Sequence, residues 1–384
     1  MKRRSFLIGS SSLIVSSLVS GCNARQTSLK VRLLEGSIPA QLLREFQKKL
    51  AGTVNLDFAP ETQLSSLFGQ LQAWQKKPEN NDWWSNLPIP LVGGKKITPI
   101  ADLVTLGDYW LAEAIRQNLI QPLDPQQLSQ WQQLPPVWQT LVKRDRQGKL
   151  DPKGKVWGAP YRWGTTVIVY RRDKFKANGW SPPTDWGDLW REELRDRISV
   201  LDRPRETIGL TLKKLGLSYN SENLDKILPK LTQELFALDR QVKFYSSDTY
   251  LQPLILGDTY VAVGWSSDIL PVMQRYHDLA AVVPQSGTAL WADLWVRPNQ
   301  TNTNQNLLQT WIDFCWQPDI ARLLSRFGSG ASPILVGDNQ AESPNSPKNQ
   351  VILPKQEIIQ KSEFLQPLSP ATLKIYQNLW NQIR

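Results

Sequence analysis

The sequence predicts an α/β protein of two lobes, each a mainly parallel sheet flanked by helices, joined by a hinge. The 384 residues suffice for two domains that each bury a core. Strand patterns at 29–34 and 53–58 alternate with a helical pattern at 40–50, as in parallel sheets covered by helices. The stretch from Trp157, WGAPYRWGTTVIVYRRD, joins an aromatic turn to a β-branched run at 165–170. This run predicts a strand buried on both faces, where the chain passes between the lobes.

Composition limits the possible function classes. The formal net charge is +10, and removing a leader with Lys2, Arg3 and Arg4 would leave +7. This surplus is spread along the chain rather than gathered in a basic arm, so we interpret it as a solvated surface and expect no nucleic-acid binding. Two cysteines and one histidine are too few for a zinc site. His277 is interpreted as a surface or half-buried helix residue rather than a catalytic group, and no cofactor is expected.

The first 22 residues have the anatomy of an export signal: a basic start, an apolar stretch at 6–19 and small residues before a cysteine. The apolar stretch is shorter than the roughly 20 residues that span a bilayer. Val19-Ser20-Gly21-Cys22 has the form of a lipobox, so we expect residues 1–21 to be removed, Cys22 to carry a lipid and residues 22–28 to form a tether. This predicts an exported protein, anchored at the periplasmic face of the cell membrane.

Two alternatives remain open in this segment. Cys22 could be an incidental cysteine, and Arg3-Arg4 could belong to a twin-arginine export signal or to an ordinary basic start. If Cys22 is lipidated, Cys315 is the only free thiol, and it is interpreted as a small buried apolar residue.

In the first lobe, a strand pattern at 101–106 ends at Gly107-Asp108, and Asp108 is predicted to cap a helix at 109–118. Ligands of open α/β sheets bind beyond the carboxyl ends of the strands, which makes Tyr109 and Trp110 candidate ligand contacts. The alternative is a helix cap followed by two core aromatics. Before this strand, residues 76–96 are rich in Pro, Asn and Gly and are predicted to form a loop that carries Trp83 and Trp84.

In the second lobe, Asp185 is predicted to cap a helix at 186–194. A strand pattern at 259–265 then places Trp265 and Asp268 at the carboxyl end of a strand, where they face the cleft if the sheet is parallel. A shorter strand pattern at 198–201 leads to an acidic loop and a helix at 206–215. There Asp202 and Glu206 are suited to compensate the helix dipole.

The strand ALWADLWV from Ala289 places Trp291, Asp293 and Trp295 on one face because side chains alternate with a period of two. A carboxylate flanked by indoles suits an alkylammonium, since the acid takes the charge and each ring face adds about 0.5–2 kcal/mol of cation–π attraction. The alternative is that these tryptophans belong to the core. Helical patterns follow at 307–316 and 320–327, and a last amphipathic helix opens at Ser369-Pro370.

Four blocks of sequence carry a family resemblance. The stretch from Trp157, ADLVTLGDYWLAEAIRQNLIQPLD from Ala101, VAVGWSSD from Val261 and ALWADLWVRP from Ala289 resemble, in this order, the periplasmic solute-binding proteins of ABC importers. The similar cluster includes the spermidine/putrescine receptors. The resemblance implies the type II periplasmic binding protein fold. It implies one lobe from residues 29–161 and 293–345 and the other from residues 162–292 and 346–384.

The resemblance also implies ligand contacts. One ligand-contacting tyrosine of the polyamine receptors falls on Tyr109 or Trp110, a glutamate that holds a ligand ammonium falls on Glu206, and further contacts fall on Trp265, Trp291 and Asp293. Two departures stand out. Leu34-Glu35-Gly36-Ser37 lacks the two aromatic contacts of that family, and Arg203 stands where a second acid is common.

The preferred hypothesis is therefore a lipid-anchored receptor without enzymatic activity. It would capture a polyamine or similar organic cation between the lobes and deliver it to the permease subunits of an ABC importer. A second hypothesis is an anion or ferric-ion receptor of the same fold that uses Arg162, Arg203 and Arg205. A third is an exported carbohydrate-active enzyme, suggested by 17 tryptophans and by Asp293 with Glu206 as a carboxylate pair.

Overall fold

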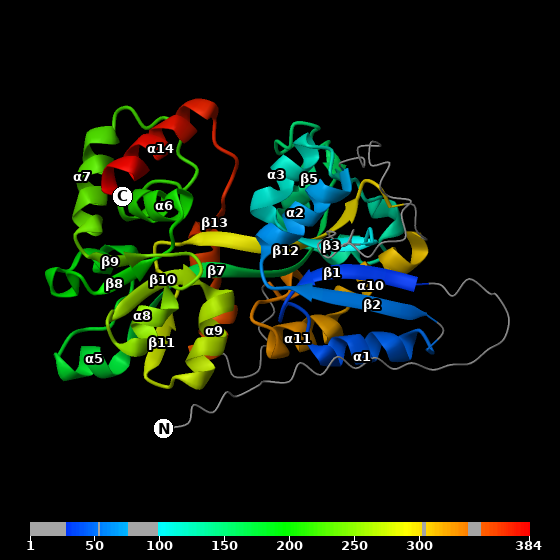
Figure 1. Cartoon of the computed structure of the whole chain (residues 1–384), viewed down its shortest axis with the longest axis horizontal. Helices are drawn as coiled ribbons and strands as arrows, with labels where there is room; N and C mark the ends of the chain where they lie inside the picture. Colours follow the sequence, from blue (N-terminus) through cyan, green and yellow to red (C-terminus); the bar gives the residue numbers. More distant parts are fainter. Residues whose placement is uncertain (1–27, 53, 76–98, 302–304, 337–346) are drawn as a thin grey trace, which may run out of the picture.

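The structure is a computed structural model that describes residues 28–52, 54–75, 99–301, 305–336 and 347–384. The predicted export signal, Cys22 and the loop with Trp83 and Trp84 lie outside the described residues. The described elements form two α/β lobes on either side of two long strands (Figure 1), which confirms the predicted fold class. Within the described ranges, no helix is both long and apolar enough to cross a membrane.

The two long strands are β7 (Ala159–Arg171) and β12 (Ala289–Pro298), and they connect the lobes as an antiparallel pair. They join the sheets of both lobes into one 11-stranded sheet whose main path is β2-β1-β3-β12-β7-β10-β8-β9. The first half of β7 pairs with β12, and its second half pairs with β10. The predicted buried strand at 165–170 is thus confirmed and begins six residues earlier, at Ala159.

Each lobe contributes three parallel strands with the same order. In lobe 1, β1 (Ser28–Leu34) lies between β2 (Asn55–Glu61) and β3 (Leu103–Gly107). In lobe 2, β8 (Ile198–Val200) lies between β9 (Val242–Tyr245) and β10 (Val261–Trp265). The last strand of each set then pairs antiparallel with a long strand: β3 with β12, and β10 with β7. This arrangement brings the carboxyl ends of β3 and β10 to the central pair.

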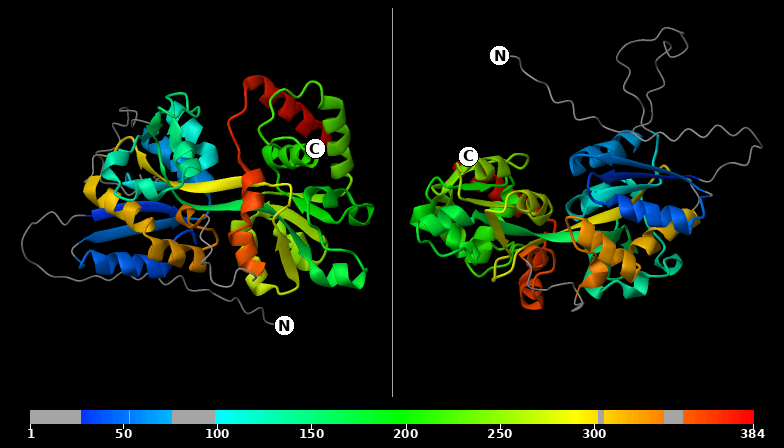
Figure 2. Two further views of the ribbon diagram at one scale, coloured as in Figure 1. Left: turned by 180° about the vertical axis from the view of Figure 1, so that it is seen from behind. Right: turned by 90° about the horizontal axis from the view of Figure 1, so that it is seen from below.

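Helices cover both faces of the lobe 1 strands, as the views in Figure 2 show. The aromatic centre of this lobe is formed by α1 and α10, where the Phe46 ring lies 4.8 Å from Trp311 and 5.0 Å from Phe314. The helices and short strands of lobe 1 are α1 (Ala40–Lys49), α2 (Leu64–Gln75), α3 (Asp108–Arg116), β4 (Ile120–Gln121), α4 (Pro136–Val142), β5 (Lys143–Arg144), β6 (Lys155–Val156), α10 (Gln305–Cys315) and α11 (Pro318–Phe327).

Lobe 2 has two packed layers beside its strands. One buried cluster includes Phe175, Trp186 and Tyr219, and another forms where α6, α7 and α14 meet around Leu231 and Tyr376. The remaining elements of lobe 2 are α5 (Arg172–Ala177), α6 (Pro204–Lys214), α7 (Leu228–Asp239), α8 (Leu251–Leu256), α9 (Ser266–Arg275), β11 (Leu279–Val282), α12 (Pro347–Ile352), α13 (Gln356–Lys361), β13 (Glu363–Phe364) and α14 (Pro370–Ile383).

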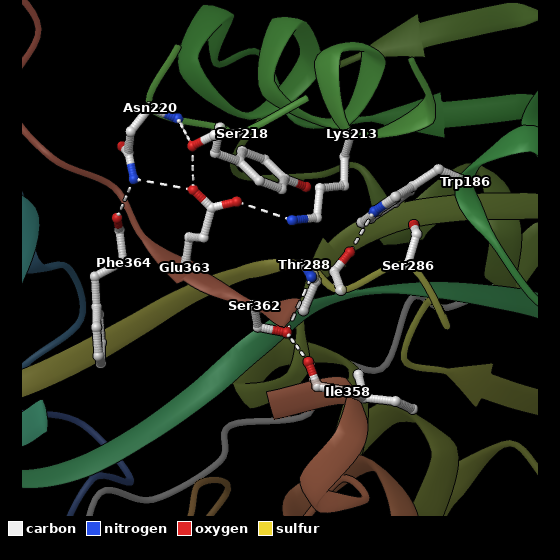
Figure 3. A network of polar contacts seen from close by, with 12 residues as sticks. Trp186, Lys213, Ser218, Asn220, Ser286, Thr288, Ile358, Ser362, Glu363 and Phe364 are labelled. Carbon is white, nitrogen blue, oxygen red and sulfur yellow. Dashed lines mark hydrogen bonds and ion pairs between the residues drawn. The ribbon is translucent and has the colours of Figure 1, made fainter. Parts of the chain in front are cut away.

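Polar contacts fasten the C-terminal segment to lobe 2 (Figure 3). The Glu363 carboxylate pairs with Lys213 Nζ at 2.8 Å and also accepts hydrogen bonds from Ser218 and Asn220. The amide of Thr288, just before β12, donates to Ser362 Oγ at 3.0 Å. Through these contacts, β13 lies parallel to the start of β12 and carries the chain on to α14.

Two predicted local structures need correction. Residues 186–194 form two short 3₁₀ turns, Trp186–Trp190 and Glu192–Leu194, rather than one helix. The chain is extended at Arg191, with φ −62° and ψ 132°, and this interrupts the helical path. The predicted cap at Asp185 is nevertheless present, because its Oδ1 accepts from the amide of Trp186 at 2.8 Å. His277 lies beyond the end of α9 rather than on a helix.

Candidate functional site

The ends of β3 and β10 converge on the same part of the β7–β12 pair. Gly107, the last residue of β3, pairs with Asp293, and Trp265, the last residue of β10, pairs with Thr166. Helix α3 begins at the residue after β3, and helix α9 begins at the residue after β10. Because ligands of α/β sheets bind at such strand ends, this is where a site is expected.

A buried ion pair lies at the centre of this region. Arg162 of β7 and Asp293 of β12 face each other across the pair, and each side chain is 2% exposed. Arg162 donates to Asp293 Oδ2 through Nε at 2.9 Å and through Nη2 at 2.5 Å. The Arg162 guanidinium also lies 5.5 Å from the ring centre of Trp291, in cation–π range. Burial raises the pKa of the Asp293 carboxyl, and the positive charge of Arg162 opposes this rise.

A second buried carboxylate belongs to Glu206, in the first turn of α6. Its Oε1 accepts from Trp265 Nε1 at 3.2 Å, and its Oε2 accepts from Thr166 Oγ1 at 3.1 Å. Burial raises the pKa of Glu206, while both hydrogen bonds act in the opposite direction. Neither of these two partners carries a charge, and the charges of Arg205 and Arg203 also lower the pKa of Glu206.

Asp268, in the first turn of α9, completes this side of the region. Its carboxylate accepts from Tyr250 Oη at 3.1 Å and from Ser267 Oγ at 3.1 Å. Burial raises the pKa of Asp268, Arg162 lowers it, and Asp293 raises it. Asp268 therefore lies close enough to Arg162 and Asp293 to feel the charges of both.

Asp108 belongs to lobe 1 and is 7% exposed. It is the first residue of α3, and the cap position is Gly107, which corrects the predicted cap by one residue. Asp108 Oδ1 accepts from the amide of Ala292 in β12 at 2.9 Å, so the side chain ties α3 to the long strand. Burial raises the pKa of Asp108 to about 7, against the lowering effect of the Ala292 amide and of Arg144.

The aromatic candidates differ in accessibility. Trp265 and Trp291 are partly exposed, and Tyr109 is 60% exposed. Trp110 is also partly exposed, and it stacks on Phe68 of α2 with 4.5 Å between ring centres. The structure thus places Tyr109, Trp265 and Trp291 at this region, and Trp110 lies beside Tyr109 with one face on the packing of lobe 1.

Trp295 needs a correction as a candidate ligand contact. It shares a face of β12 with Asp293, as the strand period predicts, but it is 0% exposed. Its ring stacks on Tyr161 at 4.1 Å between ring centres and meets Trp311 of α10 at 5.8 Å. At Trp295, two residues after Asp293, this face of β12 is therefore covered by the core of lobe 1.

Sequence reasoning missed three partners of the predicted acids: Arg162 as the partner of Asp293, Thr166 beside Glu206, and Tyr250 beside Asp268. For Arg162 a signal was present, because Arg162 and Asp293 both lie where the chain was predicted to cross between lobes. Thr166 lies inside the buried strand run, and nothing in its sequence context distinguishes it from a packing residue.

The alternative of an anion or ferric-ion receptor gains little from this geometry. Arg162 is paired with Asp293, and Arg205 is bound to Tyr219 and Asn220, so two of the three arginines of the anion hypothesis are already engaged. In the part of the chain that the structure describes, no group of three or more His, Cys, Asp or Glu side chains could hold a metal ion.

Comparisons with known proteins agree with the geometry. A family model described as bacterial extracellular solute-binding protein matches residues 98–362, more than half of the chain. The putrescine-binding periplasmic protein PotF of Escherichia coli (strain K12) is 26% identical over 302 residues, which cover 74% of this chain and 78% of PotF. The spermidine/putrescine-binding periplasmic protein of Salmonella typhimurium is 25% identical over 283 residues, covering 74% of this chain and 77% of its own.

The fold has matches among solved structures. The spermidine/putrescine ABC transporter substrate-binding protein PotD of Streptococcus pneumoniae superposes with a TM-score of 0.75 at 20% identity, covering 93% of this chain and 98% of that one. A putative spermidine/putrescine ABC transporter protein of Listeria monocytogenes gives a TM-score of 0.64 at 22% identity, with 93% and 98% covered. With the family model matched across both lobes, the chain belongs to the bacterial extracellular solute-binding proteins.

Proposed function

We propose that this protein is the receptor of an ABC importer and that it captures a small organic cation, a polyamine or a similar amine, between its lobes. The observation that carries the proposal is a set of four acids near the central strands: Asp108, Glu206 and Asp293 are buried, and Asp268, in the first turn after β10, is exposed. We call this set the acidic cluster. Relatives named for putrescine and spermidine binding support the same class of ligand.

The electrostatics of the acidic cluster favour a cation. Burial raises the pKa of all four carboxyls, which means that each ionised form lacks the solvation it would have in water. Asp293 already has Arg162 as its counter-charge, and an ammonium beside the other acids would supply one there. Charge-assisted hydrogen bonds of this kind are about twice as strong as neutral ones. The partly exposed rings of Trp265 and Trp291 add apolar surface and cation–π attraction for an alkyl chain.

Ligand-driven closure of the lobes is part of the proposal. Lobe 1, comprising residues 29–161 and 293–345, contributes Asp108, Tyr109 and Asp293, and lobe 2, comprising residues 162–292 and 346–384, contributes the other members. A ligand that contacts both lobes stabilises the closed state, in which the lobes lie closer together. This closed state would dock on the permease subunits. Closure would bend the β7–β12 pair, which connects the lobes.

Lipid anchoring at Cys22 is likewise proposed, on the strength of the lipobox form of residues 19–22. Expression of the full chain should give membrane-associated protein whose N-terminal peptide carries the mass of a lipid on Cys22. A Cys22→Ser chain should lose both properties. Membrane association without any lipid on the N-terminal peptide would contradict this part of the proposal.

Titration calorimetry with putrescine and spermidine tests the ligand class. Wild-type protein should release heat with at least one of the two amines, and Glu206→Gln should weaken that binding at least about tenfold, because a charged acceptor becomes a neutral one. Asp248→Asn, a change of an exposed acid outside the acidic cluster, serves as the matched control and should bind as the wild type does. If neither amine gives heat, the polyamine assignment is wrong.

A further inference from the structure

The position at which the sequence predicts a ligand ammonium is filled by the protein's own Arg162. A carboxylate beside an indole was expected to hold an alkylammonium, and Asp293 beside Trp291 is that pair. In the structure, two nitrogen atoms of Arg162 contact Asp293 Oδ2 at 2.9 and 2.5 Å, and its guanidinium lies 5.5 Å from the Trp291 ring centre. The side chain thus makes both interactions that a bound ammonium would make at this point.

We propose that Arg162 is a built-in cation that closes the Asp293–Trp291 subsite, so that the receptor binds ligands through one ammonium group, at Glu206 and Asp268, and gains nothing from a second. The proposal rests on the proposed function and narrows its ligand class to amines with a single recognised charge. Among the four acids, Asp293 is the one whose ion pair with an arginine is in direct contact. Within the described ranges, the hydrogen bonds that Glu206 and Asp268 accept come from uncharged side chains.

Packing holds Arg162 in this position. A Cβ atom placed on Gly330 would lie 2.7 Å from Arg162 Cγ and 3.1 Å from Cδ, so the backbone at Gly330 closes directly on the aliphatic part of the side chain. The next residue, Ala331, exchanges two backbone hydrogen bonds of 2.9 Å with Trp163, the neighbour of Arg162 in β7. The arginine is therefore enclosed by its own strand on one side and by the segment after α11 on the other.

Displacement of Arg162 by a ligand would be costly. Both members of the pair are 2% exposed, and a guanidinium that loses its carboxylate without reaching water keeps its desolvation penalty. The second ammonium of a diamine could bind Asp293 only after Arg162 had been separated from it, at this cost in free energy. A ligand with one ammonium avoids the competition, because no ion pair of the described residues has to break at Glu206 or Asp268.

Comparative titration of putrescine and butylamine, which share a four-carbon chain and differ in one ammonium, tests the proposal. For wild-type protein we expect the two dissociation constants to agree within about threefold, that is, well within one tenfold step of affinity. Arg162→Met leaves the Asp293 carboxylate without its arginine partner. The affinity for putrescine relative to butylamine should then rise at least about tenfold, the size of one charge-assisted contact. Arg162→Met/Asp293→Asn is the matched control, and it should show no such gain.

Each possible result of these titrations either supports or overturns the proposed role of Arg162. A wild-type protein that binds putrescine more than about threefold better than butylamine overturns the role of Arg162 while leaving the proposed function intact. An unchanged ratio in a folded Arg162→Met protein does the same. If wild type binds neither amine, the proposed ligand is wrong, and the inference survives only if Arg162→Met binds putrescine. Circular dichroism establishes folding, and if the Met variant is unfolded, Arg162→Gln replaces it with the same expected gain.

Discussion

Replacing Asp108 by asparagine should change how the stability of the protein depends on pH. Burial raises the pKa of Asp108 from 3.8 to about 7 in the folded state, whereas the unfolded carboxyl ionises near its ordinary value. Between these pH values the folded protein holds more protons than the unfolded chain. The free energy of unfolding therefore falls as pH rises through this window, and the contribution of Asp108 is fully lost above about pH 7.

The magnitude follows from the two pKa values. Relative to acid pH, ionisation of this group should cost ~1.5 kcal/mol of stability at pH 5 and ~4 kcal/mol at pH 8. Asp108→Asn removes the titration but keeps an oxygen that can accept from the Ala292 amide, so constant effects of the substitution cancel between the two pH values. The stability difference between variant and wild type should therefore shift by ~2.5 kcal/mol, in favour of the variant, from pH 5 to pH 8.

Urea unfolding at both pH values, followed by tryptophan fluorescence and circular dichroism, measures this shift, provided that the two signals give coincident transitions. Asp248→Asn, the exposed acid used above, should show a shift close to zero. If Asp108→Asn and wild type lose or gain stability in parallel across this pH range, Asp108 is ionised at the same pH in folded and unfolded chains, and the reasoning from its burial is wrong.

Three further predictions concern packing and the C-terminal segment. Gly264→Ala should lower stability by about 1–3 kcal/mol and abolish the Tyr250 hydrogen bond to Asp268, because a Cβ at this position would overlap the Tyr250 ring; a thermal midpoint equal to wild type would contradict this. Glu363→Ala should destabilise the protein by about 1–3 kcal/mol, since it leaves the partly buried partners of Figure 3 unsatisfied, with Glu363→Gln intermediate in urea unfolding. Burial raises the pKa of the Cys315 thiol, so in a Cys22→Ser chain a thiol reagent should react only on unfolding; rapid labelling of native protein would show that Cys315 is accessible.

The fold could be predicted from sequence because its signals are local. The alternation of strand and helix patterns gave most elements of both lobes to within a few residues, and the apolar run at 165–170 marked the long strand. The 3₁₀ turns after Asp185 were missed because a capping signal looks the same whichever helix type follows it. The extended conformation of Arg191 is not visible in the sequence.

The sequence placed Arg162 and Asp293 near the same crossing between the lobes, but their contact could not be predicted, because it depends on the register between two distant strands. Asp293 pairs with Arg162, but the next residue, Leu294, pairs with Pro160, so Tyr161 forms a bulge in β7. A shift of one residue in a ladder moves a side chain to the other face, and no local pattern announces such a bulge. Trp295 was misjudged for a related reason: the strand period fixed its face, but its covering by α10 is a matter of tertiary structure.

The order of the segments of the two lobes along the sequence has a consequence for biosynthesis. Lobe 1 takes α10 and α11 from beyond residue 300, and lobe 2 takes α14, which ends at Ile383, so each lobe is interrupted by the other in sequence. A ribosome must therefore finish nearly the whole polypeptide before either half can assemble, and contacts between distant residues slow folding. Neither half can be excised by a single cut, and a chain that stops before α12 would leave α6 and α7 without the helix that packs on them.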